Sequence, residues 1–135
     1  MFKSQIKVPS HPSSSLQHIL TYLSDRLSRI LPHTLPKLVH VNLIENCTAT
    51  ILKQYDALLG NELNQKRALQ YLFDVKFLTI LSIPRENMKL IQTSQAICDK
   101  LRSKIDPFDL DVFYPYMQDN IKRCVLQFQV KIYQL

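Results

Sequence analysis

Glycine is almost absent from this sequence, since Gly60 is the only one among 135 residues. Turns with positive φ usually require glycine, and folds rich in β-hairpins contain many such turns. The scarcity therefore argues against a sheet protein and favours long helices with few joints. It also excludes the glycine-rich loops that bind phosphate groups in nucleotide-binding proteins, because those loops need backbone conformations that only glycine supplies.

Long apolar runs and paired cysteines are missing as well. No stretch of about 18 uninterrupted apolar residues occurs, so the sequence predicts no membrane-spanning helix. The first 15 residues are polar and contain proline where a secretory signal would be apolar. Cys47, Cys98 and Cys124 form no CxxC pair. Three isolated cysteines are typical of reduced core thiols in a cytosolic protein, so we expect all three to serve packing.

The motifs that carry enzyme chemistry are absent too. The four histidines are scattered, with no HExxH spacing, and no serine lies in a GxSxG turn. Asp106, Asp109 and Asp111 form the densest acidic group, but a helix start explains the first two better than a bound cation does. We therefore expect a protein that is not an enzyme, with no catalytic residue, no cofactor, no metal and no small-molecule substrate.

Apolar residues recur at steps of three and four along most of the chain, which is the spacing of one helix face. The pattern predicts helices over residues 14–31, 40–59, 62–81 and 84–105, a short element from residue 106 and a last helix from residue 115. No segment shows the alternation of a strand. We expect an all-α antiparallel helical bundle that forms a single domain over residues 14–135, preceded by a flexible tail over residues 1–13.

Capping residues and proline suggest where these helices begin. Asn61 is the expected cap of the third helix, Pro84 the expected first turn of the fourth, and Asp106 the expected cap of the short element. The inward face of the third helix is predicted to carry Leu69, Leu72, Phe73, Phe77, Ile80 and Leu81. Its other faces are predicted to carry Arg67, Gln70, Asp74 and Lys76.

The formal net charge is +6, which leaves an alternative function open. Small basic clusters occur at Lys66 and Arg67 and again over residues 100–104. A basic helical module could bind nucleic acid or anionic lipid through such clusters. No aromatic residues interleave with them as a base-stacking platform requires, and a solvated basic face is the simpler interpretation.

Aromatic residues gather near the last joint of the chain. Phe108 and Phe113 are predicted to lie in the core. Tyr114 and Tyr116 flank Pro115, and a role in binding a partner weighs evenly against simple surface packing. These two tyrosines, together with Lys66 and Arg67, are the candidate partner contacts.

Two segments resemble a known family. The first is Asn64-Gln65-Lys66-Arg67-Ala68-Leu69-Gln70-Tyr71-Leu72-Phe73-Asp74-Val75-Lys76-Phe77-Leu78, and the second is Ile105-Asp106-Pro107-Phe108-Asp109-Leu110-Asp111-Val112-Phe113. Both resemble the C-terminal part of subunit 1 of the conserved oligomeric Golgi complex, a vesicle-tethering assembly. The similarity extends from about residue 9 to about residue 125, and the second segment is its most specific piece.

The resemblance implies properties that composition does not. It implies helical rods and a non-enzymatic scaffold that acts in intra-Golgi retrograde transport and keeps glycosylation enzymes in their cisternae. The implied location is the cytosolic face of the Golgi membrane, with peripheral attachment through the complex. The implied partners are the other subunits of the complex, with no nucleic acid. The family has no catalytic or metal-binding residues. Subunit 1 is normally a much longer chain, and residues 127–135 differ from the family's ending.

Overall fold

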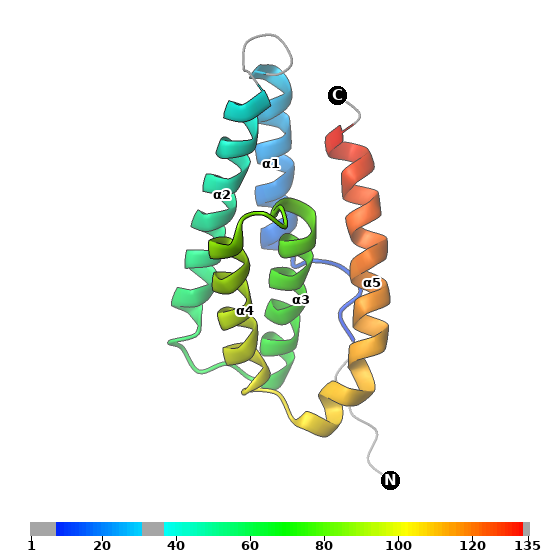
Figure 1. Ribbon diagram of the computed structural model, residues 1–135. Helices are drawn as coiled ribbons and strands as arrows, with labels where there is room; N and C mark the ends of the chain where they lie inside the picture. Colours follow the sequence, from blue (N-terminus) through cyan, green and yellow to red (C-terminus); the bar gives the residue numbers. More distant parts are fainter. Residues whose placement is uncertain (1–7, 31–36, 134–135) are drawn as a thin grey trace.

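The computed structural model describes residues 8–30 and 37–133, and in those residues the chain forms helices and no strands (Figure 1). The helices are α1 (Ser14–Ile30), α2 (Lys37–Leu58), α3 (Gln65–Ser82), α4 (Met88–Arg102) and α5 (Pro107–Tyr133). They lie roughly alongside one another, and α1 and α2 extend past the end of the α3–α4 pair. The predicted all-α helical bundle is confirmed.

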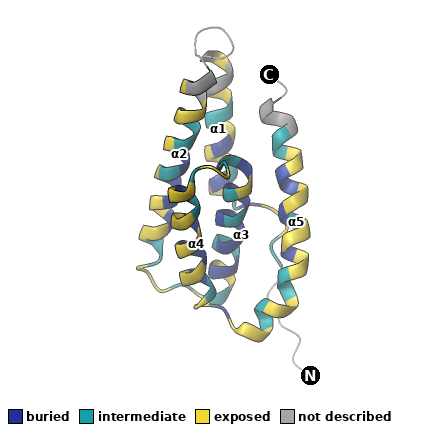
Figure 2. Ribbon diagram, in the orientation of Figure 1, coloured by how far each residue is buried: buried dark blue, intermediate teal, exposed yellow. Residues whose placement is uncertain are grey.

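Helix α3 is the centre of the bundle, because α2, α4 and α5 all pack against it. Leu72, Phe73 and Phe77 are completely buried, and Figure 2 shows α3 as the most buried of the central helices. The ring of Phe77 meets the ring of Phe128 of α5 edge to face, with centroids 5.3 Å apart. The core is completed mainly by Leu16, Leu20, Ile51, Leu52, Leu69, Leu78, Ile97, Leu101, Met117, Ile121 and Val125.

Two helix starts differ from the sequence prediction. Helix α3 begins after Asn64, whose side-chain oxygen accepts a hydrogen bond from the Arg67 backbone N–H at 2.8 Å, and not after Asn61. Helix α4 begins after Asn87, whose side chain accepts from the Leu90 N–H at 3.2 Å. Pro84 therefore lies ahead of α4 and not in its first turn. In both cases an asparagine nearer the apolar run offers the same capping chemistry.

Helix α5 is continuous, so the prediction of a short element followed by a separate helix from Pro115 is wrong. Pro115 lies inside α5, where it lacks the N–H that would bond the Asp111 carbonyl. The first turns of α5 are tilted relative to the rest, as a proline kink produces (Figure 1). Asp106 does cap this helix, since its carboxylate accepts a hydrogen bond from the Phe108 N–H at 2.9 Å.

Two apolar residues expected in the core are exposed. Ile80 on α3 is 55% exposed and Phe108 on α5 is 82% exposed. Ile80 lines an open pocket between α3, α4 and α5. Phe108 lies in the first turn of α5, which extends beyond the ends of α3 and α4 (Figure 1).

Cys98 and Cys124 are buried as expected, whereas Cys47 is only partly buried.

Residues 8–13 lie against the helices and lead into α1. The Pro9 carbonyl accepts a hydrogen bond from Asn120 at 3.1 Å, and the Ser10 carbonyl accepts one from the Cys124 thiol at 3.3 Å. Pro12 is buried. Residues 1–7 lie outside the described residues, so the flexible tail expected over residues 1–13 stays a prediction for that part.

A buried carboxylate links this segment to the core. Asp74 of α3, predicted on an outer face, is completely buried. It accepts hydrogen bonds from the Tyr55 hydroxyl at 2.6 Å, the Ser13 N–H at 2.8 Å and the Gln70 amide at 3.0 Å. Burial raises the pKa of Asp74, although these donors act to lower it. Burial, with the nearby carboxylate of Asp74, also raises the pKa of Tyr55. Asp74 therefore joins α2, α3 and the segment before α1.

Candidate partner-binding surface

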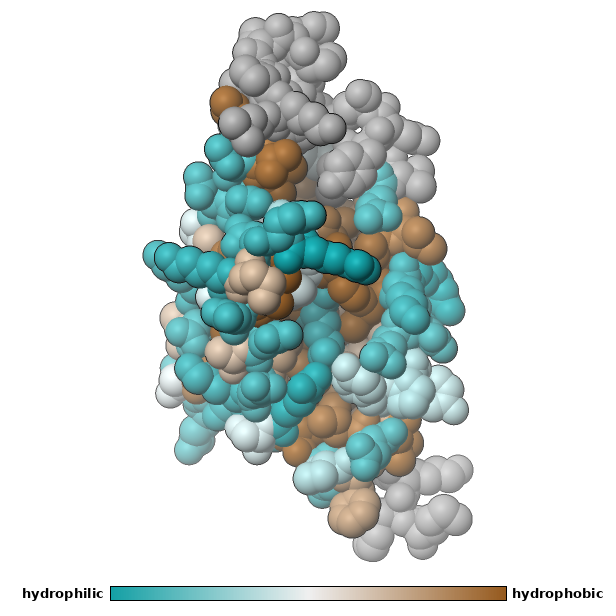
Figure 3. Space-filling model, viewed as in Figure 1, coloured by the Kyte–Doolittle hydropathy of each residue, from teal (hydrophilic) through white to brown (hydrophobic). Residues whose placement is uncertain are grey.

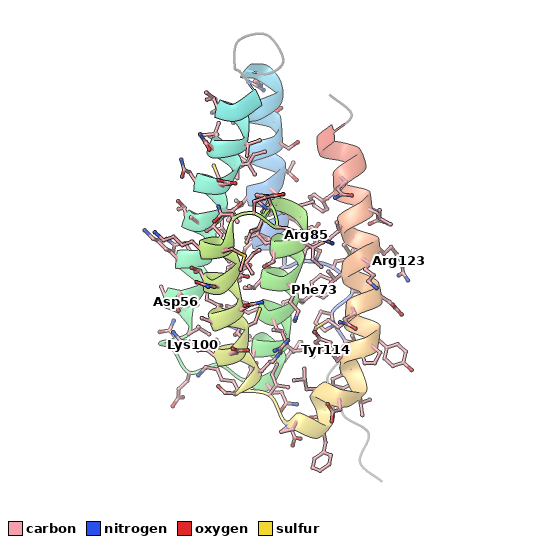
Figure 4. The ribbon with its side chains drawn as sticks, viewed as in Figure 1. Asp56, Phe73, Arg85, Lys100, Tyr114 and Arg123 are labelled. Carbon is pink, nitrogen blue, oxygen red and sulfur yellow. The ribbon has the colours of Figure 1, made fainter. Side chains whose placement is uncertain are left out.

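Tyr114 is partly buried and faces α3 and α4 (Figure 4). Its ring lies between Lys76 of α3 and Arg102 of α4, with the Lys76 ammonium 5.2 Å and the Arg102 guanidinium carbon 5.9 Å from the ring centroid. Figure 4 shows Tyr114 on the side of α5 that faces α3 and α4. Burial alone raises the pKa of Tyr114, but the two cations outweigh it and leave the pKa below its usual range. Tyr114 thus has an evident role in joining three helices.

Tyr116 points the other way. It is 65% exposed on α5, although it is only two residues from Tyr114. Two residues correspond to about 200° around a helix, so the two side chains must lie on nearly opposite faces. The structure therefore does not bring the two candidate tyrosines together.

Lys66 and Arg67 are exposed in the first turn of α3. Arg67 also lines a mainly apolar groove of about 710 Å³ between α1, α2 and α3. The groove is further lined by Leu16, Ile19, Leu23, Cys47, Ile51, Tyr55, Leu58 and Tyr71. The partly buried Cys47 belongs to this groove, which explains why it is not a fully enclosed core residue.

The other basic cluster is largely neutralised within the chain. Lys100 pairs with Asp56 of α2 at 3.3 Å, and Arg102 pairs with Asp99 at 3.4 Å. Figure 4 shows Asp56 and Lys100 side by side. The two basic clusters identified in the sequence therefore lie on different helices, and Lys100 and Arg102 already have acidic partners.

Sequence reasoning missed two exposed apolar residues that share a face with Tyr116. Phe108 is 82% exposed and Val112 is 61% exposed. Phe108, Val112 and Tyr116 follow one another at intervals of four residues on α5. The spacing was visible in the sequence, but it did not reveal that this face lacks a neighbouring helix. We call these three residues the α5 stripe.

The side chain of Gln65 fixes the first turn of α5 in place. Its amide nitrogen donates to the Asp109 carboxylate, and its oxygen accepts from the Asp106 N–H at 3.0 Å. One glutamine of α3 therefore binds both a backbone and a side-chain group at the start of α5. These bonds set the direction in which the α5 stripe leaves the bundle.

Replacing Gln65 with alanine is expected to lower the free energy of unfolding by about 1 to 2 kcal/mol, because two hydrogen bonds at a partly exposed site are lost. Urea denaturation followed by circular dichroism measures the change. Lys66→Ala is the matched control, since Lys66 is the exposed next residue of the same turn and should change stability by less than about 0.5 kcal/mol. Equal effects of the two substitutions would contradict the assigned role of Gln65.

The remaining chemistry of the described residues is modest. Burial raises the pKa of Cys98 and of Cys124, which keeps both thiols protonated and unreactive. Within residues 8–30 and 37–133, no group of three or more His, Cys, Asp or Glu side chains is arranged to hold a metal ion. Among the described helices, none has the length and apolar character needed to cross a membrane.

Three curated relatives match most of the chain, and each is named conserved oligomeric Golgi complex subunit 1. The Mus musculus protein is 32% identical over 137 residues, which cover 90% of this chain and 14% of the relative. The Homo sapiens protein is 30% identical, with the same coverage. The Drosophila melanogaster protein is 34% identical over 131 residues, which cover 94% of this chain and 15% of the relative. The resemblance carried by the two sequence segments is confirmed.

The chain spans only 14 to 15% of the length of these relatives. The similarity therefore concerns one segment of a longer protein, consistent with the C-terminal part that the two motifs indicated. No family model matches the chain, and no solved structure matches it.

Proposed function

Since this chain is related in sequence to a segment of the conserved oligomeric Golgi complex subunit 1 family, we propose that it is a non-enzymatic scaffold element of that tethering complex. It contributes to intra-Golgi retrograde transport and to the retention of glycosylation enzymes by holding other subunits through helix packing. The single observation that supports this most strongly is the match of at least 30% identity over nine-tenths of the chain.

The proposal includes a location and a set of partners. The chain acts at the cytosolic face of the Golgi membrane, where it is attached peripherally through the assembly. Its partners are other subunits of the complex, and it needs neither nucleic acid nor a small-molecule substrate. Residues 14–135 act as one domain. Tyr116, Lys66 and Arg67 are proposed partner contacts because their side chains are exposed. Tyr114, the fourth candidate, is proposed to act by holding α5 against Lys76 of α3 and Arg102 of α4.

The geometry supports a scaffold in a second way. The described part of the chain devotes its buried residues to one continuous core and leaves ten large hydrophobic side chains exposed. Scattered exposed apolar residues are ordinary, but a row of them on one helix is typical of a protein that packs against another. The structure therefore offers a surface for packing.

Co-purification tests the proposal directly. An affinity-tagged copy of the chain, expressed in cells, is expected to recover other subunits of the tethering complex, identified by mass spectrometry. Leu72→Asp, which disrupts the core, is the negative control and should recover none. If the wild-type chain is folded by circular dichroism and still recovers none of these subunits, the proposed function is wrong.

A further inference from the structure

The α5 stripe is a continuous apolar row on the outside of the molecule. Phe108, Val112 and Tyr116 are 82%, 61% and 65% exposed. At 1.5 Å per residue, the eight steps from Phe108 to Tyr116 extend for about 12 Å, or roughly two helical turns. Figure 2 shows that the outer side of these first turns is largely exposed, and Figure 3 shows hydrophobic surface at the same end of α5.

The fold does not use these three side chains. The inward face of α5 carries a different set, with Met117 and Ile121 buried and Leu110 and Phe113 packed against the core. At Phe108 the contact that caps α5 is made by the backbone N–H and not by the ring. Large aromatic side chains that are exposed and absent from the core are the type that dominates binding at protein interfaces.

The stretch of α5 that carries the stripe is acidic, unlike the chain as a whole. Residues 106–121 contain four aspartates and no lysine or arginine, whereas the whole chain has a formal net charge of +6. By helix geometry, Asp109 and Asp111 lie on the two sides of the stripe, and Asp119 follows Tyr116 at its far end. Asp111 and Asp119 are exposed. The stripe is therefore an apolar row with an acidic border along its length, and the exposed Arg123 lies one turn beyond Asp119 on the same side of α5.

We propose that the α5 stripe docks an amphipathic helix of another subunit, whose apolar residues are bordered by lysine and arginine. This deepens the proposed scaffold function and rests on it. An apolar row selects the apolar face of a helix, and the acidic border selects a basic flank over an acidic one. An anionic membrane is disfavoured as the occupant because the aspartates repel it.

The docking surface is held rigidly. Gln65 binds the Asp109 carboxylate and the Asp106 N–H, which fixes the first turn of α5 against α3. Pro115 lies between Val112 and Tyr116, and the helix is kinked there, so that the first turns are tilted relative to the rest of α5 (Figure 1). A surface that is already ordered loses little entropy on binding, which favours affinity.

A pair of synthetic peptides of about 18 residues tests the chemistry of the partner. One presents leucines on one helix face with lysines on both flanks, and the other replaces every lysine with glutamate. The chain should bind the lysine peptide at least about tenfold more tightly than the glutamate peptide, measured by fluorescence anisotropy. Equal affinity for the two peptides, or preference for the glutamate peptide, would overturn the proposal.

Substitutions locate the binding to the stripe. The combined variant Phe108→Ser, Val112→Ser and Tyr116→Ser should weaken binding of the lysine peptide by about tenfold or more. The control is Tyr22→Ser with Met88→Ser, since these side chains are 57% and 58% exposed on α1 and α4. The control should bind as the wild type does. Asp111→Asn with Asp119→Asn should reduce both the affinity and its dependence on salt. Unchanged binding by the stripe variant overturns the assignment.

A second set of measurements separates this proposal from the proposed function. In the co-purification experiment, the stripe variant should lose at least one subunit that the wild type recovers, while the control variant keeps all of them. If the stripe variant also keeps all of them, the docking proposal is wrong and the scaffold function stands. If the wild type recovers none, the scaffold function fails, and the peptide pair still decides whether the stripe prefers a basic helix.

Two further measurements test for a different occupant of the stripe. Analytical sedimentation would detect self-association of the chain through the stripe, and a vesicle assay would detect stripe-dependent binding to phosphatidylserine. Either result would overturn the proposal.

Discussion

Leu72→Asp is expected to remove most or all of the stability of this chain. Leu72 is completely buried in α3, the helix against which α2, α4 and α5 pack. The substitution deletes a packed leucine and leaves a carboxylate in the core with no cation provided for it. Deleting the packed leucine costs about 2 to 5 kcal/mol, and burying the unpaired carboxylate costs about 3 to 5 kcal/mol. The sum is comparable with the whole free energy of unfolding of an ordinary domain, about 5 to 15 kcal/mol.

Thermal unfolding followed by circular dichroism measures this effect. The matched control is Ile80→Asp, which introduces the same carboxylate on the same helix, eight residues further along. Ile80 is 55% exposed, so its aspartate stays in water and should cost less than about 1 kcal/mol. A Leu72→Asp variant that melts like the wild type would mean that this face of α3 is not the core of the protein.

Leu72 and Ile80 also show how far helical periodicity can be trusted. The three-and-four spacing correctly placed Leu69, Leu72, Phe73 and Phe77 inside. It placed Ile80 with them, although Ile80 opens onto a pocket between α3, α4 and α5 while Leu78 and Leu81 beside it are buried. Periodicity defines a face of a helix, but how closely the neighbouring helices cover each edge of that face is a tertiary property which the local pattern does not contain.

Helix α5 shows the same limit in another form. Pro115 is a strong local signal for a helix start, and the sequence interpretation ended one element before it. The partly buried Leu110 and Phe113 before it and the buried Met117 and Ile121 after it pack on the same bundle. Continuous burial on both sides of the proline outweighs one missing hydrogen bond and leaves only a kink.

The sequence located the segment that holds the aromatic candidate contacts, but it did not show which of their side chains are exposed. Sequence reasoning identified the aromatic segment and favoured the core for Phe108. The structure leaves Phe108 exposed and turns Tyr114 inward, where Lys76 and Arg102 flank its ring. These positions depend on which helices lie beside α5, so composition and spacing could not separate an exposed aromatic from a packed one. The family resemblance needed no such knowledge, because it rests on the identity of successive residues.

Asp74 is the residue that sequence reasoning misplaced most clearly. A charged residue on a helix is expected at the surface, since an isolated buried carboxylate is costly. Its burial is tolerated because the Tyr55 hydroxyl, the Ser13 N–H and the Gln70 amide all donate to it. These donors come from residues 19, 61 and 4 positions away in the chain, respectively. Only the Gln70 contact was within reach of a local pattern.

Asp74→Ala is expected to lower the free energy of unfolding by about 3 to 5 kcal/mol, because it leaves the buried Tyr55 hydroxyl and two part-buried donors without their acceptor. Tyr55→Phe removes one of those donors and should cost about 1 to 3 kcal/mol. Chemical denaturation measures both. If Asp74→Ala cost no more than Tyr55→Phe, Asp74 would not be the centre of the network. The outer carboxylate Asp119, changed to alanine, is the exposed control and should have little effect.

Asp74 also predicts a direction of pH dependence. Burial raises the pKa of Asp74 in the folded chain above its ordinary value of 3.8. Between pH 3.8 and the folded pKa, the Asp74 carboxyl is therefore protonated to a greater extent in the folded state than in the unfolded state. Stability contributed by the protonated group is therefore present below pH 3.8 and is lost as the pH rises through the folded pKa. Asp74→Asn cannot titrate, so the stability of the wild type minus that of Asp74→Asn should fall as the pH rises through this window. Urea unfolding at a series of pH values from acid to neutral measures the difference. A difference that grows with pH would mean that the three donors have outweighed burial and that Asp74 is held as a carboxylate with a depressed pKa.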